Sequence, residues 1–122
     1  MPLQIKRIYD PYQESDGLRY LVDRLWPRGI SKEAAHLTGW LKTLAPSTAL
    51  RKQFGHMSER FAEFSVLYRD ELDASPETQA AAREIIQQSR QHTVTLLYGA
   101  KDPHFNQAVV LLDYLQEKSR TE

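Results

Sequence analysis

The sequence predicts an α/β protein, a three-layer sandwich in which a small, mostly parallel sheet of about four strands is flanked by helices. Residues 93–99 (TVTLLYG) are nearly continuous in apolar and β-branched side chains, as expected for a strand that is covered on both faces. Segments with helical periodicity precede and follow this strand. Alternation of strands with helices along the chain is typical of parallel α/β architectures.

The length and composition indicate a single domain over residues 1–122. No apolar run approaches the roughly 20 residues of a membrane span, and the first ten residues lack the apolar core of a signal peptide. The chain has no cysteine, which excludes disulfides, thiolate catalysis and thiolate metal sites. We therefore expect a cytoplasmic protein that does not bind membranes.

Two short strands are predicted near the N-terminus. Leu3–Tyr9 has β-branched and aromatic content and ends at Asp10-Pro11, because proline cannot continue a ladder. Leu18–Leu25 follows the turn signal at 15–17. The connection is shorter than the dozen or so residues of a parallel crossover. The two strands are thus either antiparallel, or parallel with a reduced crossover.

The segment 36–44 is ambiguous from its pattern. Its apolar residues have helical spacing, whereas Thr38 and Gly39 are poor helix residues, and we favour a strand. Ser47 is a suitable N-cap for a short helix over 48–54, which Gly55 is expected to end.

Three longer helices are predicted in the second half of the chain. The first runs from Ser58 to about Leu72, and its aromatic and leucine stripe is typical of a buried core face. The second begins at Ser75-Pro76 and runs to about Gln91, and the third begins at Asp102-Pro103 and runs to about Lys118. A capping residue followed by proline is a strong helix start.

Charge is unevenly distributed along a chain whose net charge is zero. Residues 1–56 carry nine Lys and Arg against five Asp and Glu, a net +4, and residues 57–122 carry seven against eleven, a net −4. A basic half beside an acidic half indicates either an anionic ligand on one side or a chance placement of solvated charges.

Polar residues follow the predicted strands at the edge where α/β sheets bind ligands. Arg24 and Arg28 flank the Trp26-Pro27 strand break, and guanidinium groups suit phosphate or carboxylate recognition. Helix N-termini at Ser47 and Asp102 would offer free amides at the same edge. The predicted anion-binding residues are Arg24, Arg28, Lys32, Ser47, Arg51, Lys101 and Asn106. Alternatively, some of the arginines pair with nearby carboxylates and fix loops in place.

Asp23, His56 and Tyr98 are the candidates for proton transfer. No nucleophile-elbow pattern surrounds Ser47, so this serine is better interpreted as a helix cap. The four histidines show no metal-ligand spacing, and no Walker loop or G-x-G-x-x-G motif occurs. We therefore predict no metal and no cofactor.

Several segments resemble one protein family. DRLWPRG at 23–29 and APSTALR at 45–51 are specific in combination, and RIYD, EFSVLYRDEL and TVTLLYGAKDPHFNQAVVL extend the match over almost the whole chain. Together they resemble the YeaO-like branch of the domain-of-unknown-function family numbered 488. The resemblance implies a strand–helix–strand start with the helix reduced to a turn, and so favours parallel strands. It implies no particular activity.

Two functions remain open from the sequence. The first is an enzyme or processing factor with a basic, anion-binding cleft that acts on a phosphorylated ligand, a nucleotide or a nucleic acid. The second is a non-catalytic binding module for an anionic metabolite or a protein partner. Nucleic-acid binding is expected to be weak, because the net charge is zero and no known reader module is present. The sequence does not indicate an oligomeric state.

Overall fold

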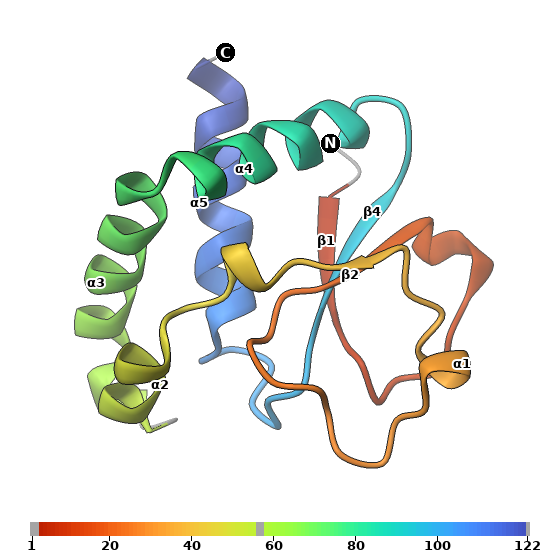
Figure 1. The fold of residues 1–122 in the computed structure, drawn as a ribbon, viewed down its shortest axis with the longest axis horizontal. Coiled ribbons are helices and arrows are strands. Elements are labelled where there is room, and N and C mark those ends of the chain that lie inside the picture. The colour runs from red at the N-terminus through yellow and green to blue at the C-terminus, as the bar shows by residue number, and fades with distance from the viewer. Residues whose placement is uncertain (1–2, 56–57, 122) are drawn as a thin grey trace.

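A parallel sheet of four strands forms the centre of the computed structural model, which describes residues 3–55 and 58–121 (Figure 1). The strands are β1 (Leu3–Arg7), β2 (Leu18–Leu21), β3 (Gly39–Trp40) and β4 (Val94–Tyr98). Their order across the sheet is β1-β4-β2-β3, and every adjacent pair is parallel. The predicted α/β class is confirmed.

Five α-helices accompany the sheet within the described part of the chain. They are α1 (Lys32–Ala35), α2 (Thr48–Phe54), α3 (Phe61–Ala74), α4 (Pro76–Ser89) and α5 (Gln107–Thr121). Single 3₁₀ turns are η1 (Glu14–Asp16), η2 (Lys42–Leu44) and η3 (Ser58–Arg60). None of the described helices combines the length and the apolar character needed to cross a membrane.

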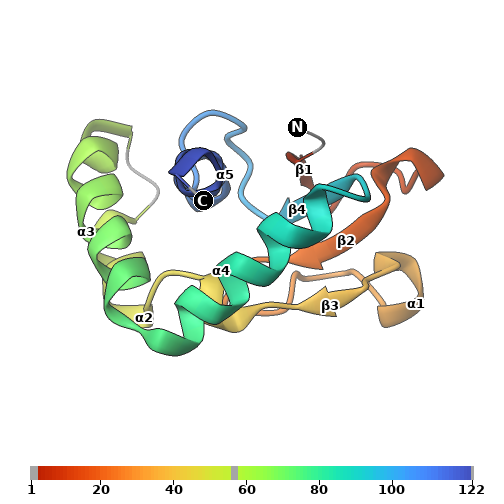
Figure 2. The same cartoon turned by 90° about the horizontal axis from the view of Figure 1, so that it is seen from above.

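The two faces of the sheet carry cores of different size, because successive side chains of a strand point to opposite faces. Val94, Leu96 and Tyr98 of β4 pack with α2–α5 in a large core, whereas Leu97 packs with Ala35 of α1 in a small one. Helices α3 and α5 lie on one side of the strands and α1 on the other (Figure 2). The third layer is therefore a loop-rich segment that contains a single helical turn.

β1 and β2 are parallel, which settles the alternative left open by the sequence. β4 lies between them, and the connection contains only the turn η1. The crossover is the reduced form that the resemblance favours.

The second strand is shorter than predicted. It ends at Leu21 instead of Leu25, although the Val22 N–H still donates to the Leu97 carbonyl at 3.0 Å. The Asp23 carboxylate accepts the next free amide of the central strand, that of Gly99, at 2.8 Å. The Asp23 side chain thus replaces the next backbone hydrogen bond between β2 and β4, and the chain leaves the sheet at this residue.

The ambiguous segment 36–44 contains both a strand and a turn. β3 pairs with β2 over two residues, Gly39 and Trp40, so the favoured strand exists but is short. The apolar residues with helical spacing continue into the turn η2, where Leu44 is fully buried.

Two of the predicted helix starts are confirmed. Ser47 caps α2 through a hydrogen bond from the Leu50 N–H, and Gly55 ends it with a left-handed backbone. Ser75 caps α4 ahead of the proline at its first position. The helix expected from Ser58 starts with η3, and α3 itself extends to Ala74.

The predicted start of the last helix at Asp102 is wrong. The Asp102 carboxylate accepts the His104 and Phe105 N–H groups in a turn of the loop, and Asn106 caps α5 by accepting the Ala108 N–H at 2.9 Å. Because the loop is four residues longer than expected, Phe105 is 39% exposed.

A buried ion pair links the thin third layer to the sheet. Arg19 of β2 is 1% exposed, and its guanidinium donates to the Asp16 carboxylate and to the Ala35 carbonyl. Lys6 also binds Asp16, at 3.0 Å. A buried charge needs such partners to be tolerated, so this network fixes α1 against β2.

Replacement of the two central leucines should test the two-sided burial of β4. Leu96→Ala and Leu97→Ala should each lower the free energy of unfolding by about 2–5 kcal/mol, because each leaves a cavity in a fully buried layer. Urea denaturation measures the change. Val66→Ala, on an exposed position of α3, is the control and should stay within about 0.5 kcal/mol. A loss below about 1 kcal/mol at either leucine would contradict this burial.

Candidate functional site

A cavity of about 280 Å³ opens beside the ends of β2 and β4. Its walls come from the segment after β2, the start of the β4–α5 connection, and the helices α2, α3 and α5. The lining residues are Tyr9, those at positions 23–28, Pro46, Arg51, Phe54, Phe64, Gly99, Ala100 and Gln107. The cavity lies at the sheet edge where the sequence predicts a ligand site.

Asp23 lies in this cavity and joins three elements. One carboxylate oxygen accepts the Gly99 N–H at 2.8 Å, and the other accepts the side-chain amide of Gln107 at the start of α5. A Cβ atom at position 99 would lie 3.0 Å from the carboxylate, so this close approach favours glycine there. The contact explains why the central strand is followed directly by glycine.

Burial raises the pKa of Asp23 to about 6, whereas the Gly99 N–H and the charge of Arg51 act in the opposite direction. The ordinary value is 3.8. None of the ion pairs formed among residues 3–55 and 58–121 involves Asp23. The cavity thus contains a half-buried carboxyl group that titrates close to neutrality.

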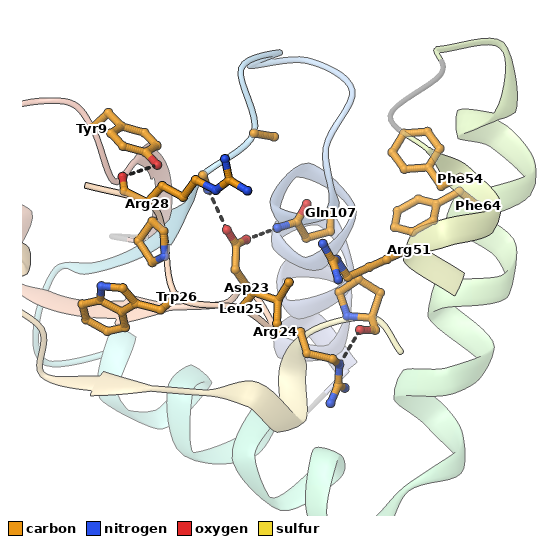
Figure 3. Close-up of a pocket in the computed structure, with 14 residues that line it drawn as sticks. Tyr9, Asp23, Arg24, Leu25, Trp26, Arg28, Arg51, Phe54, Phe64 and Gln107 are labelled. Carbon is orange, nitrogen blue, oxygen red and sulfur yellow. Dashed lines mark hydrogen bonds between the residues drawn. The ribbon is translucent and has the colours of Figure 1, made fainter. Parts of the chain in front are cut away.

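Arg28 and Arg51 approach Asp23 from opposite walls (Figure 3). Within the described residues, neither guanidinium makes a hydrogen bond or an ion pair. The Arg28 backbone carbonyl accepts the Tyr9 hydroxyl at 2.9 Å, and Trp26 donates to the Ile30 carbonyl at 2.7 Å, which together hold the loop in place. Two uncommitted guanidinium groups therefore face one cavity.

Arg24 lines the cavity with its stem, but its head group serves a structural role. The guanidinium turns away from Asp23 and donates to the Pro46 carbonyl at 2.9 Å and to the Ala45 carbonyl at 3.3 Å (Figure 3). It thereby fixes the segment that leads into α2. The sequence predicts the same anion-binding role for Arg24, Arg28 and Arg51, but in the structure the Arg24 guanidinium binds backbone carbonyls instead.

One wall of the cavity is aromatic. Phe54 of α2 and Phe64 of α3 stack with ring centroids 4.4 Å apart, and Phe61 adds a third ring behind them. Phe105, in the loop before α5, packs edge-on against Phe61. The predicted core stripe of α3 is buried at Phe64, and this same side chain also lines the cavity.

The other predicted anion-binding residues lie outside this lining. Ser47 donates to Glu71 at 2.6 Å while it caps α2. Lys32 is exposed at the start of α1, and Lys101 is exposed in the loop after β4. Asn106 is fully buried as the cap of α5.

Of the three candidates for proton transfer, the cavity contains Asp23. Tyr98 is buried in the large core and does not line the cavity, and burial raises the pKa of its hydroxyl. His56 lies outside the described residues.

Gln107 and Tyr9 line the cavity and were not predicted. A glutamine in the first turn of an amphipathic helix carries no local signal of a site, and Tyr9 resembles any aromatic residue at a strand end. Gly99 had a recognisable signal, since a glycine directly after a buried strand indicates a close approach.

No group of three or more His, Asp or Glu side chains within residues 3–55 and 58–121 is arranged to hold a metal ion. The polar groups that line the cavity include the Arg28 and Arg51 guanidiniums, the Asp23 carboxyl group and the Gln107 amide. Such a set can bind an oxyanion and can exchange a proton with it.

A family model described as the inactive DUF488-N3 subclade matches residues 2–122. The chain belongs to the DUF488 family. It is 42% identical over 116 residues to the uncharacterised protein YeaO of Escherichia coli (strain K12), a match that covers 95% of this chain and 98% of YeaO. It is 35% identical over 113 residues to the uncharacterised protein Rv3073c of Mycobacterium tuberculosis (strain ATCC 25618 / H37Rv), covering 93% and 92%. No solved structure matches significantly.

The different roles of Arg24 and Arg28 can be tested by measuring the free energy of unfolding of their variants. Arg24→Met should lower the free energy of unfolding by about 1–3 kcal/mol, because buried backbone carbonyls lose their donors. Arg28→Met should change it by less than about 0.5 kcal/mol, since that guanidinium is exposed. Urea denaturation of both variants provides the comparison, and equal losses would contradict the assignment.

The raised pKa of Asp23 predicts a specific pH dependence. Between the unfolded value and about 6, the folded protein binds the Asp23 proton more tightly than the unfolded chain does. The Asp23 contribution to the free energy of unfolding is therefore largest below the unfolded value. It is lost as the pH rises toward 6, by on the order of 3 kcal/mol.

Asp23→Asn keeps the shape of the side chain and removes this titration. Urea denaturation from about pH 4 to about pH 7.5 should show the variant gaining stability relative to the wild type as the pH rises. A difference between the two proteins that does not change with pH would contradict the raised pKa.

Proposed function

We propose that the cavity binds a small oxyanion or an anionic metabolite, and that Arg28 and Arg51 are its ligands. The observation that carries the proposal is the presence of two guanidiniums that face one cavity without an acceptor among the described residues. Like charges held toward the same space repel one another, and an anion between them relieves this repulsion. Guanidinium groups also match phosphate and carboxylate geometry with paired N–H donors.

The shape and lining of the cavity set the size of the ligand. A volume of about 280 Å³ is at the lower end of ligand pockets and accommodates a small metabolite. The stacked Phe54 and Phe64 rings offer a flat apolar surface at one wall, and Leu25, 60% exposed, offers another. A ligand with one anionic group and one apolar part fits this arrangement.

The proposal has two forms, binding without chemistry and catalysis. The description of the matching family model as an inactive subclade is the reason to consider a binding module. Catalysis is the second candidate, because a carboxyl group with a pKa of about 6 suits proton transfer near neutral pH. Either form requires the anion to bind between the two arginines.

Anion-dependent thermal stability tests the proposal. Inorganic phosphate at about 100 times its dissociation constant should stabilise the wild type by roughly 2.7 kcal/mol. Arg28→Ala and Arg51→Gln should keep the fold and lose this gain. Arg83→Ala, on an exposed position of α4 outside the cavity, is the matched control and should keep the gain.

A screen in which phosphate, carboxylates, sugar phosphates and nucleotides all leave the melting temperature unchanged would contradict the proposed function. An anion effect that persists in both arginine variants would place the binding elsewhere and would also contradict it.

A further inference from the structure

We propose that Asp23 makes this site selective for an oxyanion that carries its own proton, such as hydrogen phosphate, over a fully ionised oxyanion such as sulfate. The selectivity depends on the anion binding proposed above, and it assigns the class of anion to that same site.

The Asp23 carboxylate, a hydrogen-bond acceptor, lies in the proposed anion site. Asp23 lines the same cavity as Arg28 and Arg51 and lies between their guanidinium groups in the close-up (Figure 3). An oxyanion that binds both arginines therefore comes next to a carboxylate. An acidic side chain at this position would repel a ligand whose oxygens are all ionised or can only accept hydrogen bonds.

Asp23 cannot readily turn away from the ligand. Its two oxygens accept hydrogen bonds from the Gly99 N–H and the Gln107 amide, which come from two different elements. Each carboxylate oxygen has two lone pairs, so each can accept one further hydrogen bond. The side chain is thus a fixed acceptor with capacity left on the cavity side.

The chemistry of the two anions differs in one proton. Sulfate at neutral pH offers only acceptor oxygens, so its contact with Asp23 is repulsive. Hydrogen phosphate has the same tetrahedral shape and carries a P–OH group that can donate to the carboxylate. A hydrogen bond to an ionised acceptor, compared with no bond, predicts about 10- to 100-fold tighter binding of phosphate.

The surroundings of Asp23 decide how this preference changes with pH. The charged and titratable groups around it are Arg51 from α2, Tyr68 from α3, Arg28 from its own segment and Tyr9 after β1. The Arg24 guanidinium turns away to the Pro46 carbonyl, and α5 presents the neutral Gln107. Burial raises the pKa of the Asp23 carboxyl group to about 6. Below that pH it becomes a donor, and sulfate should then be accepted.

Calorimetric titration of the full chain with inorganic phosphate and with sulfate tests the selectivity. At about pH 7.5 the wild type should prefer phosphate by about 10- to 100-fold. Asp23→Asn keeps an acceptor for Gly99 and removes the negative charge. It should therefore bind sulfate more tightly and bring the ratio close to one. The same ratio in both proteins would overturn the proposal.

A series on the wild type alone covers the case in which the variant does not fold. Sulfate affinity should rise as the pH is lowered from about 7.5 to 5, and phosphate affinity should change less. Equal binding of both anions by the wild type at about pH 7.5 would overturn the selectivity and leave the proposed function intact. No binding of either anion would overturn the selectivity, and the proposed function would fall as well if carboxylates, sugar phosphates and nucleotides also failed to bind.

Discussion

The Asp23 carboxyl group holds together the part of the molecule where a ligand can bind. It ends β2 by taking the Gly99 N–H, and it reaches α5 through Gln107. Because the chain leaves the sheet at this residue, the segment 23–28 lies over the strand ends and closes one side of the cavity. Burial of this group without an ion-pair partner disfavours its charged form. A carboxylate at this position therefore lowers the free energy of unfolding at neutral pH.

The arginines of the first half divide into two kinds by what their guanidinium groups bind. Arg7, Arg19 and Arg24 donate to backbone carbonyls, and Arg19 also pairs with Asp16. Arg19 holds the third layer in place, and Arg24 holds the entry to α2. Arg28 and Arg51 have no such acceptors among the described residues and face the cavity. Some arginines of the basic half therefore stabilise the fold through internal hydrogen bonds, and the others are available to bind a ligand.

Local signals in the sequence were sufficient for most of the fold. The nearly continuous apolar pattern of TVTLLYG is enough to predict a strand that is buried on both faces. Ser47 and Ser75-Pro76 cap helices through residues that are close in sequence, so their effect can be predicted locally. The start of α5 could not be obtained this way, because Asp102 and Asn106 are both capable caps. Which of them begins the helix depends on how the loop packs against the sheet.

The cavity lies at the sheet edge where the sequence predicts a site, but which residues line it depends on contacts distant in sequence. Arg24 and Arg28 look equivalent on either side of Trp26-Pro27. They differ because the carbonyls of the segment 42–46 come close to Arg24. Gln107 reaches Asp23 across a separation of 84 residues, which no local pattern encodes.

The most direct measurement is a crystal structure of the protein grown with arsenate, a phosphate analogue whose arsenic atom is located by its anomalous scattering. Arsenic density in the cavity should lie between the guanidinium groups of Arg28 and Arg51, with one arsenate oxygen within hydrogen-bond distance of the Asp23 carboxyl group. An empty cavity at saturating arsenate, or arsenic bound only at other surfaces, would contradict the assignment of this cavity as an anion site.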